Sequence, residues 1–382
     1  MAQLYDFVVG GGSVAGLAFA SEASKRGARV LVFEEHPEIG EPEKCDGLVS
    51  LRGLRKYGYP PAREVIQNGV ASAVIHTPSG RELPINATSL EVVVLDRSAY
   101  DKQLAAAATS NGATIQAGVR VGSVEEGPEG VAVTAGDTVV RSKYYVDATG
   151  PSSSPRKGIL PAAKYEVEGE WVKGHVVEVF ADAEMYPGFF AWVIPFGPHR
   201  AKVGAAGYGI NPFKALDWFL EERPCSILRK VSAPIYIGGP APRFSVGRRI
   251  LVGESAGQVK PTTAGGIMTS LAGGVMAARW ACGALQGNGQ PMLENYQKEW
   301  EAAFLKEMKN MLRLRGVFEK LSNADLEALV NVMAAPRLMA KISQADFDFH
   351  ATAVLGALGV QGLLRMAKLV ASAEARSLLA GG

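Results

Sequence analysis

The stretch VVGGGSVAGLAFA, residues 8–20, constrains the fold more than any other part of the chain. An apolar run changes into small residues and then into an Ala-rich helical pattern, which predicts a strand, a tight turn and the start of a helix. The best register is Gly11-x-Ser13-x-x-Gly16, with serine where a middle glycine would stand. Small residues let a diphosphate approach the backbone N–H groups at a helix N-terminus. We therefore expect a phosphate-binding turn.

An acidic strand end follows at the spacing of a dinucleotide-binding fold. Residues 28–33 (ARVLVF) form an apolar strand pattern that ends in Glu34 and Glu35. An acid about 20 residues after the glycines is where such a fold binds the adenosine ribose hydroxyls. No Arg stands here to bind a 2′-phosphate, so the two features favour FAD or NAD over NADP. The alternatives are a glycine turn without a ligand and a solvated strand end.

Length, charge and cysteine content limit the class of protein. A chain of 382 residues predicts about two to three domains. A net charge of +2, with no basic run between aromatics, gives no reason to expect a nucleic-acid partner. Three isolated cysteines predict no disulfide framework and favour a reducing compartment, and five scattered histidines predict no metal site. No basic leader and no apolar stretch of roughly 18 residues is present, so we expect a cytoplasmic protein.

A turn-rich loop with a single cysteine follows the acidic strand end. The loop HPEIGEPEKCDGLVS covers residues 36–50 and holds Cys45 between two glycines. A lone cysteine is most often a small buried hydrophobic residue. Loops at this position run back past the far end of a dinucleotide, so Cys45 is also a candidate to face a redox ring.

Three later stretches lead back toward the same site. Residues 70–95 are predicted to be β structure, and Arg97 opens the helix that follows, where it suits either a helix-terminal salt bridge or a cofactor diphosphate. The predicted strand-turn-strand of residues 112–133 puts Val121 where its backbone can reach an adenine edge. The strand 144–146 then runs into Thr149 and Gly150, a second approach of small residues to the nucleotide.

Residues 164–239, in the middle of the chain, contain an aromatic cluster, and the segment after them contains a second glycine turn. Residues 164–239 are predicted to be β-rich, and Phe190 and Trp192 fall on one face of a strand, where packing within the sheet is the default interpretation. The segment RRILVGESAGQVKPTTAGGIMTSLAGG, residues 248–274, predicts another strand, turn and helix. That helix N-terminus offers N–H groups and a positive dipole end to an anionic ring or phosphate.

The C-terminal part is predicted to be helical from about Met292, because apolar residues recur at spacings of three and four. Residues 351–364 carry no charge and are followed by Arg365, Lys368 and Arg376. A helix packed on the body is the first interpretation. The alternative is an interfacial segment with basic anchors, in peripheral contact with the inner face of the membrane.

Five blocks together resemble a known group of flavoproteins. VVGGGSVAGL, LVFEE, LDRSAYDKQLA, VDATGPSSSPR and VGESAGQVKPTTAGGI are similar, in this order and across most of residues 1–285, to the FAD-binding blocks of para-hydroxybenzoate-hydroxylase-like flavoproteins. The loop EIGEPEKCDG and the run Pro187-x-x-Phe190-x-Trp192-x-Ile194-Pro195 resemble the cysteine loop and the P-x-x-Y-x-W-x-F-P signature of the geranylgeranyl reductase family. The block QVKPTTAGGI is most similar to archaeal members, which saturate the isoprenoid chains of ether lipids.

The resemblance implies a set of cofactor-binding residues. Those expected on the ADP half of FAD are Gly11, Ser13, Val14, Ala15, Gly16, Glu34, Glu35, Arg97, Val121, Thr149 and Gly150. Those expected around the diphosphate, ribityl chain and isoalloxazine ring are Cys45, Gly253, Glu254, Pro261, Gly265, Gly266 and Ile267. Three departures stand out: Ser13 replaces a glycine, Glu254 replaces an Asp, and Phe190 with Ile194 replaces the Tyr and Phe of the pocket signature.

The resemblance also implies the architecture. We expect an α/β fold (α+β overall), with a Rossmann-like FAD-binding domain of the para-hydroxybenzoate hydroxylase type formed by residues 1–163 and 240–291. Its first part contains a β excursion at residues 60–95. Residues 164–239 are expected to form an inserted antiparallel β-sheet substrate domain, and residues 292–382 a helical cap.

The implied activity is saturation of isolated C=C bonds in geranylgeranyl chains of membrane ether-lipid precursors, by hydride transfer from reduced flavin N5 plus protonation. Phe189, Phe190 and Trp192 would form the apolar wall of the substrate pocket, and Cys45 is the candidate catalytic proton donor. No second glycine-rich fingerprint is present, so NAD(P)H visits transiently or another reduced carrier delivers the electrons. The alternatives are a flavin-dependent monooxygenase or halogenase, because residues 190–195 resemble the halogenase W-x-W-x-I-P block, and a non-catalytic FAD-containing lipid-binding protein.

Overall fold

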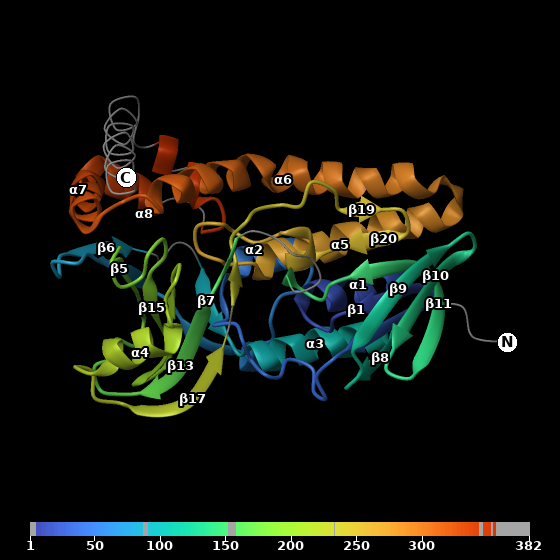
Figure 1. Cartoon of the computed structure of the whole chain (residues 1–382), viewed down its shortest axis with the longest axis horizontal. Helices are drawn as coiled ribbons and strands as arrows, with labels where there is room; N and C mark the ends of the chain where they lie inside the picture. Colours follow the sequence, from blue (N-terminus) through green and yellow to red (C-terminus); the bar gives the residue numbers. More distant parts are fainter. Residues whose placement is uncertain are drawn as a thin grey trace.

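The computed structural model describes residues 5–86, 91–151, 158–232, 234–343, 347–352 and 354–356. Two large sheets lie side by side, and a long helix runs along both of them (Figure 1). The basic residues after position 364 and residues 152–157 of the fourth block lie outside the described ranges. Within those ranges, no helix combines the length and the apolar character needed to cross a bilayer.

The first sheet has eight strands and carries the glycine turn. Its order is β19–β20–β11–β1–β2–β8, with β10 and β9 continuing antiparallel from β11. The strands are β1 (Tyr5–Gly10), β2 (Val30–Glu34), β8 (Thr114–Ala117), β9 (Val121–Gly127), β10 (Gly130–Ala135), β11 (Thr138–Asp147), β19 (Ser245–Val246) and β20 (Arg249–Leu251). The strands β20, β11, β1, β2 and β8 pair in parallel. Such a sheet is buried on both faces, which accounts for the continuous apolar runs.

Three helices cover one face of this sheet. They are α1 (Val14–Lys25), α3 (Arg97–Ser110) and α5 (Ile267–Gly283). Phe7 and Val9 of β1 pack with α1 and α5 in the main hydrophobic cluster, whereas Val8 packs with β10 on the opposite face. A Cβ atom on Gly274 would lie 2.3 Å from the carbonyl oxygen of Ala15, so the glycine is what lets α5 lie directly against α1.

The second sheet has seven strands and comes from two separate stretches of chain. Its order is β17–β13–β16–β15–β14–β5–β6. The strands are β5 (Ser72–His76), β6 (Glu82–Asn86), β13 (Ala162–Glu168), β14 (Val176–Phe180), β15 (Ala191–Gly197), β16 (Arg200–Ala206) and β17 (Ser226–Ser232). Strand β5 pairs with β14 in parallel, and all other neighbours are antiparallel. The expected β excursion therefore contributes two strands to the sheet of the middle segment.

Helix α4 (Pro212–Leu220) covers one face of the seven-stranded sheet. Asn211 caps it by accepting hydrogen bonds from the N–H groups of Phe213 and Lys214, and Pro212 occupies the first turn. Leu216 and Phe219 of this helix pack on Tyr165, Val203 and other buried side chains of the sheet. This face is closed by apolar contact.

Smaller elements connect the two sheets. A three-stranded sheet contains β3 (Leu48–Ser50), β7 (Val92–Leu95) and β4 (Ile66–Gly69), and β12 (Ile159–Leu160) pairs with β18 (Ile235–Tyr236). The short helices are α2 (Leu51–Lys56), the 3-10 turns η1 (Arg63–Val65) and η4 (Gly253–Ala256), and the π-helical turn η5 (Ala284–Asn288). The strand prediction for residues 70–95 is confirmed in β5, β6 and β7, and residues 87–90 of that range lie outside the described residues.

The C-terminal helices are α6 (Gly289–Phe318), α7 (Asn323–Met333) and α8 (Pro336–Ser343), which confirms the helical prediction over this range. Trp300, Phe304 and Met308 are buried on one side of α6 in the main cluster, as expected for a core face. At its far end Arg315 lies over the ring of Phe189 at 4.9 Å and donates to the carbonyl oxygen of Gly188. Helix α6 thus reaches from the first sheet, in the main cluster, to the ring of Phe189, which follows β14 of the second sheet.

Candidate functional site

The first glycine turn has the backbone shape that the sequence predicts. Gly11 has a φ of 105°, and a Cβ atom there would lie 2.3 Å from the carbonyl oxygen of Ala148. A Cβ atom on Gly16 would lie 2.1 Å from the carbonyl oxygen of Gly11. Both distances are too short for any side chain. The turn therefore requires glycine at both positions, and β11 lies directly behind it.

The first turn of α1 has no side-chain cap. Ser13 is the N-cap residue, but its hydroxyl donates to Asp101 at 3.0 Å instead of accepting from the helix N–H groups. These N–H groups and the positive end of the helix dipole remain available to an anion. Ser13 in place of glycine thus leaves the anion-binding end of α1 open.

The two acidic residues after β2 have different surroundings. Glu34 accepts a hydrogen bond from the N–H of Gly12 at 2.8 Å, so its carboxylate lies beside the glycine turn. The N–H of Val119 donates to the carbonyl oxygen of Glu34 at 2.8 Å, and this brings the start of β9, with Val121, near the same strand end. Glu35 instead pairs with Arg120 at 3.5 Å, where both side chains are exposed. Only Glu34 contacts the glycine turn.

Arg97 is buried beside the turn and keeps one donor unused. Its guanidinium contacts Asp101 at 3.0 Å and Ser13 at 3.3 Å, while its buried Nε has no hydrogen-bond partner among the described residues. Burial would lower the pKa of Arg97, but Asp101 and then Cys45 beside the guanidinium raise it above its ordinary value. Arg97 is therefore a fixed cation beside the open helix end, and Cys45 lies next to it.

The second glycine turn, residues 253–266 between β20 and α5, meets the first. Gly253 has a φ of 63°, and a Cβ atom there would lie 2.8 Å from the Cβ of Ala15 in α1. Ser255 accepts a hydrogen bond from the N–H of Gly150 at 3.0 Å and donates to Asp147 at 3.0 Å, which ties residues 147–150 to the same turn. Thr149 also donates to Asp147, at 2.8 Å. The residues expected around both halves of the cofactor thus lie together.

Glu254 is a titratable group at this meeting point. A Cβ atom on Gly150 would lie 3.7 Å from its carboxylate oxygen. Desolvation in this position raises the pKa of Glu254 to about 7, although Arg97 acts in the opposite direction. The carboxyl is therefore near its midpoint at neutral pH.

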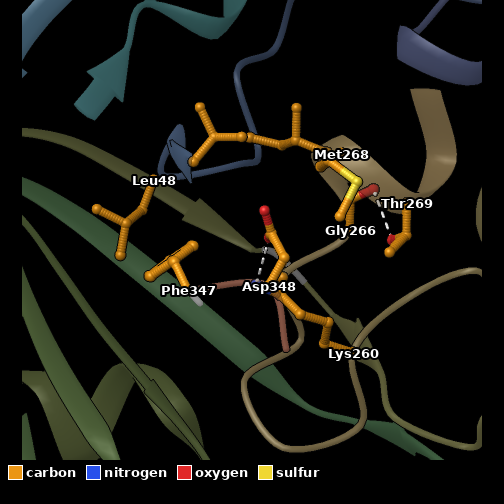
Figure 2. A pocket seen from close by; sticks show the side chains of 10 residues that line it. Leu48, Lys260, Gly266, Met268, Thr269, Phe347 and Asp348 are labelled. Carbon is orange, nitrogen blue, oxygen red and sulfur yellow. Dashed lines mark hydrogen bonds and ion pairs between the residues drawn. The ribbon is translucent and has the colours of Figure 1, made fainter. Parts of the chain in front are cut away.

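A pocket lies where α5 begins (Figure 2). Its lining includes Gly265, Gly266 and Ile267 from the second glycine turn and Leu48 from the segment after Cys45. Lys260 lines the pocket beside Gly265, and its ammonium contacts Asp348 at 3.1 Å and the ring of Phe347 at 4.3 Å. Pro261 is the buried residue that follows Lys260. The sequence analysis did not find Phe347 or Asp348, because nothing in their neighbourhood indicates a contact with residue 260.

The aromatic cluster lies near this pocket, although none of its rings is among the residues that line it. Phe189 and Phe190 stack with ring centroids 4.0 Å apart, and Trp192 meets both edge-on. Phe189, Phe190 and Trp192 pack with Ala264, next to Gly265, and Trp192 also packs with Leu48. The indole N–H of Trp192 donates to Asp46 at 2.8 Å. An apolar wall therefore stands between the Cys45 loop and the second glycine turn.

Buried charges join the Cys45 loop to the seven-stranded sheet. Lys202 contacts Glu43 at 2.6 Å, and Lys164 donates to the carbonyl oxygen of Cys45 at 2.9 Å. We call Glu43, Asp46, Lys164 and Lys202 the charged seam. The sequence analysis missed it because lysines that alternate with apolar residues are typical of a solvated sheet face.

The residues present fit FAD. The uncapped end of α1, the unused donor of Arg97 and the glycine turn suit a diphosphate, and Glu34 stands where a ribose would be bound. The second turn and the start of α5 offer N–H groups and a dipole end to the ring. Within the described residues these features converge on one region.

Comparisons with known proteins agree with this geometry. A model of the FAD binding domain family matches residues 5–210. Digeranylgeranylglycerophospholipid reductase 2 of Methanopyrus kandleri is 31% identical over 360 residues, covering 86% of this chain and 90% of that protein. The reductase of the same name from Methanothermobacter thermautotrophicus is 29% identical, covering 89% and 94%.

Solved structures share the fold. A geranylgeranyl bacteriochlorophyll reductase-like protein from Thermoplasma acidophilum superposes with a TM-score of 0.86 at 24% identity, covering 97% of this chain and 99% of that one. A flavin-dependent brominase superposes with a TM-score of 0.69 at 16% identity, covering 93% and 98%. The expected fold class and cofactor are confirmed: the chain belongs to the FAD-binding domain family and, within it, to the geranylgeranyl reductase family of FAD-dependent oxidoreductases.

Proposed function

We propose that this oxidoreductase saturates isolated C=C bonds in the geranylgeranyl chains of membrane ether-lipid precursors. The observation that carries the proposal is the apolar wall of Phe189, Phe190 and Trp192 beside the Cys45 loop and the second glycine turn. An isoprenoid chain offers only apolar surface to its binding site, and such a wall suits it. The names of the relatives from Methanopyrus and Methanothermobacter support the same substrate class.

We assign the cofactor-binding roles as follows. Gly11, Ser13, Gly16 and Arg97 bind the diphosphate, and Glu34 binds the adenosine ribose. The other expected residues of the ADP half are Val14, Ala15, Glu35, Val121, Thr149 and Gly150, and those around the ribityl chain and ring are Gly253, Glu254, Pro261, Gly265, Gly266 and Ile267. The exposed pairing of Glu35 with Arg120 supports Glu34 over Glu35 as the ribose ligand.

The chemistry requires a hydride and a proton. Bound FAD, once reduced, supplies the hydride. An isolated alkene has no carbonyl to polarise it, so a protein group must deliver the proton to the other carbon while water is excluded. In our proposal Cys45, half-buried beside Arg97 and behind the apolar wall, holds that proton on Sγ. The rings of Phe189, Phe190 and Trp192 shield the positive charge that develops on the alkene.

The electron donor in this proposal is NAD(P)H or another reduced carrier that visits the site transiently. We infer the residues 164–239 as the substrate-binding part and the C-terminal helices as a cap over the lipid. The proximity of Arg315 in α6 to Phe189 supports a role for this helix at the end of the apolar wall.

The test is anaerobic reoxidation of the reduced holoenzyme by a geranylgeranylated glycerophospholipid, with mass spectrometry of the product. We expect a ladder of two-hydrogen increments. Cys45→Ala should lower turnover about 100-fold, the usual contribution of a positioned proton donor, and leave FAD bound. Cys225→Ala is the matched control, since Cys225 is also half-buried but packs on the face of the seven-stranded sheet that α4 covers.

Three outcomes would contradict parts of the proposal. Equal turnover in the Cys45 and Cys225 variants would remove Cys45 from the proton transfer. Rapid oxygen consumption with an oxygenated or halogenated product would favour the monooxygenase or halogenase. Reduced protein that keeps its electrons when offered lipid would remove the reductase function, and slow oxygen consumption as well would favour the non-catalytic lipid-binding alternative.

A further inference from the structure

The face of the seven-stranded sheet that meets the Cys45 loop carries two fully buried lysines. Lys164 in β13 pairs across the sheet with Gly204, and Lys202 in β16 pairs with Glu166. Each lysine is 1% exposed. Paired residues of antiparallel strands point to the same face, so both ammonium groups lie opposite the face that α4 covers. Lysine is almost never fully buried unless its charge is paired.

Lys164 contacts the Cys45 loop in two ways. Its Nζ donates to the carbonyl oxygen of Cys45 at 2.9 Å and lies 3.9 Å from Oδ1 of Asp46. That carboxylate oxygen is buried and accepts no hydrogen bond among the described residues, so the charge of Lys164 is what offsets its desolvation. The strand of Lys164 and the loop are more than a hundred residues apart in the chain. Lys164 therefore holds the carbonyl oxygen of Cys45 from the sheet.

Asp46 extends the contact to the apolar wall. Its other carboxylate oxygen accepts the indole N–H of Trp192 at 2.8 Å. The indole in turn lies flat against β16, where a Cβ atom on Gly204 would be 2.1 Å from the ring. Cys45, Asp46 and Trp192 are thus held as one unit, with Lys164 at its base.

Lys202 holds the loop at residues on either side of Cys45. Lys202 already contacts Glu43 at 2.6 Å and the carbonyl oxygen of Asp46 at 3.4 Å. Replacement of a buried ion pair by apolar side chains of similar volume is often neutral for stability, so the ammonium of Lys164 is not explained by stability alone. What Lys164 adds is a directed bond to the residue that carries the thiol.

We propose that Lys164 is a positioning residue, which sets the place of the Cys45 thiol relative to Arg97 and Trp192 through the Cys45 carbonyl oxygen. The proposal rests on the proposed function in one respect: the position of the thiol affects turnover only if Cys45 takes part in the reaction. The position itself can be measured without turnover.

The first measurement is the alkylation rate of Cys45 by iodoacetamide in the FAD-loaded protein, followed by peptide mass spectrometry that separates Cys45 from Cys225 and Cys282. Lys164→Met removes the bond, and the loop should open more often, so Cys45 should react at least about tenfold faster than in the wild type. Lys230→Met is the matched control, because Lys230 lies in the same sheet but is half-exposed and pairs with Asp217. It should leave the rate within about twofold of the wild type.

Two further variants separate positioning from charge neutralisation. Asp46→Asn keeps an acceptor for Trp192 and leaves the bond from Lys164 to Cys45, so alkylation should stay within about twofold of wild type. Asp46→Asn with Lys164→Met removes the pair of Lys164 with Asp46 as a whole, while Glu166 keeps Arg229 and Glu43 keeps Lys202. Its unfolding midpoint should therefore exceed that of Lys164→Met alone. Its Cys45 should still react at least about tenfold faster than wild type. If Lys164→Met alone does not fold, this double variant still shows whether Lys164 positions the thiol or only neutralises a carboxylate.

Slow alkylation in the double variant would overturn the proposal, because Lys164 would then serve only to neutralise Asp46. Equal rates in Lys164→Met and Lys230→Met would overturn it as well. In lipid reduction, the expected signature is a kcat about tenfold lower with KM within about twofold, since the bond orients a reacting group and not the lipid. If the wild type reduces no lipid while the alkylation pattern holds, the proposed function fails and the positioning role stands.

Discussion

The charged seam and the cofactor site differ in how their buried carboxyl groups are compensated. In the seam, burial would raise the pKa of Glu43, but Lys202 and then Lys164 hold it below its ordinary value. In the cofactor site, burial raises the pKa of Glu254 to about 7, and Arg97 offsets only part of this. Each acid of the seam forms an ion pair with a lysine of the seam, whereas the cofactor site keeps the buried Nε of Arg97 without a partner among the described residues. The comparison distinguishes buried charges that pair with each other and stabilise the fold from a buried charge, Arg97, that keeps a donor available for a ligand.

Breaking the seam should have the largest effect. Lys202→Met leaves the carboxylate of Glu43 buried without its partner, so the free energy of unfolding should fall by about 4 kcal/mol. Lys230→Met removes an exposed pair and should leave the unfolding midpoint close to that of the wild type. Urea denaturation at pH 7 measures both. Equal losses would show that the seam is no more than an ordinary set of surface pairs.

The two carboxyl groups should give opposite pH dependences. The raised pKa of Glu254 means that its ionisation disfavours the folded state as pH rises from about 4.5 through about 7, a loss of about 3 kcal/mol that Glu254→Gln should abolish. The lowered pKa of Glu43 means that its contribution is present above its ordinary pKa and is lost as pH falls below it. Unfolding of the FAD-free chain at pH 5 and pH 8 measures the first effect. Parallel curves for Glu254→Gln and the wild type would contradict it.

The smallest expected effect distinguishes two neighbouring acids in the cofactor site. Glu34→Ala should weaken FAD binding about tenfold or more, because the carboxylate lies at the glycine turn. Glu35→Ala should change it by less than about twofold, since the side chain pairs with Arg120 at the exposed surface. Quenching of FAD fluorescence on titration measures both. A larger effect for Glu35 would reverse our assignment of the ribose ligand.

The glycine turn was easier to predict from the sequence than the seam, and the reason is local geometry. The turn at Gly11 and Gly16 has no space for side chains, so its composition carries the signal directly. The choice between Glu34 and Glu35 could not be made, because it depends on which carboxylate reaches the N–H of Gly12. Lys164 alternates with buried apolar residues, and only the folded loop shows that its face is covered.

The sequence also did not predict which strands would form the seven-stranded sheet. The strand pattern of residues 70–95 was correct, but the parallel pairing of β5 with β14 joins segments about a hundred residues apart. Pairing over such separations leaves no periodic trace in either strand. By contrast, the burial of the sheet face under α4 agrees with the apolar residues at alternate positions of β13 and β16.

The parallel pairing of β5 with β14 has a consequence for synthesis on the ribosome. The hairpin of β5 and β6 is complete at Asn86, but its partner strand begins only at Val176. A lone hairpin is marginal in water, and its exposed edge invites pairing with other chains. Until translation passes β14, the nascent protein carries an unfinished edge, so slower elongation between these two strands should increase aggregation of new chains.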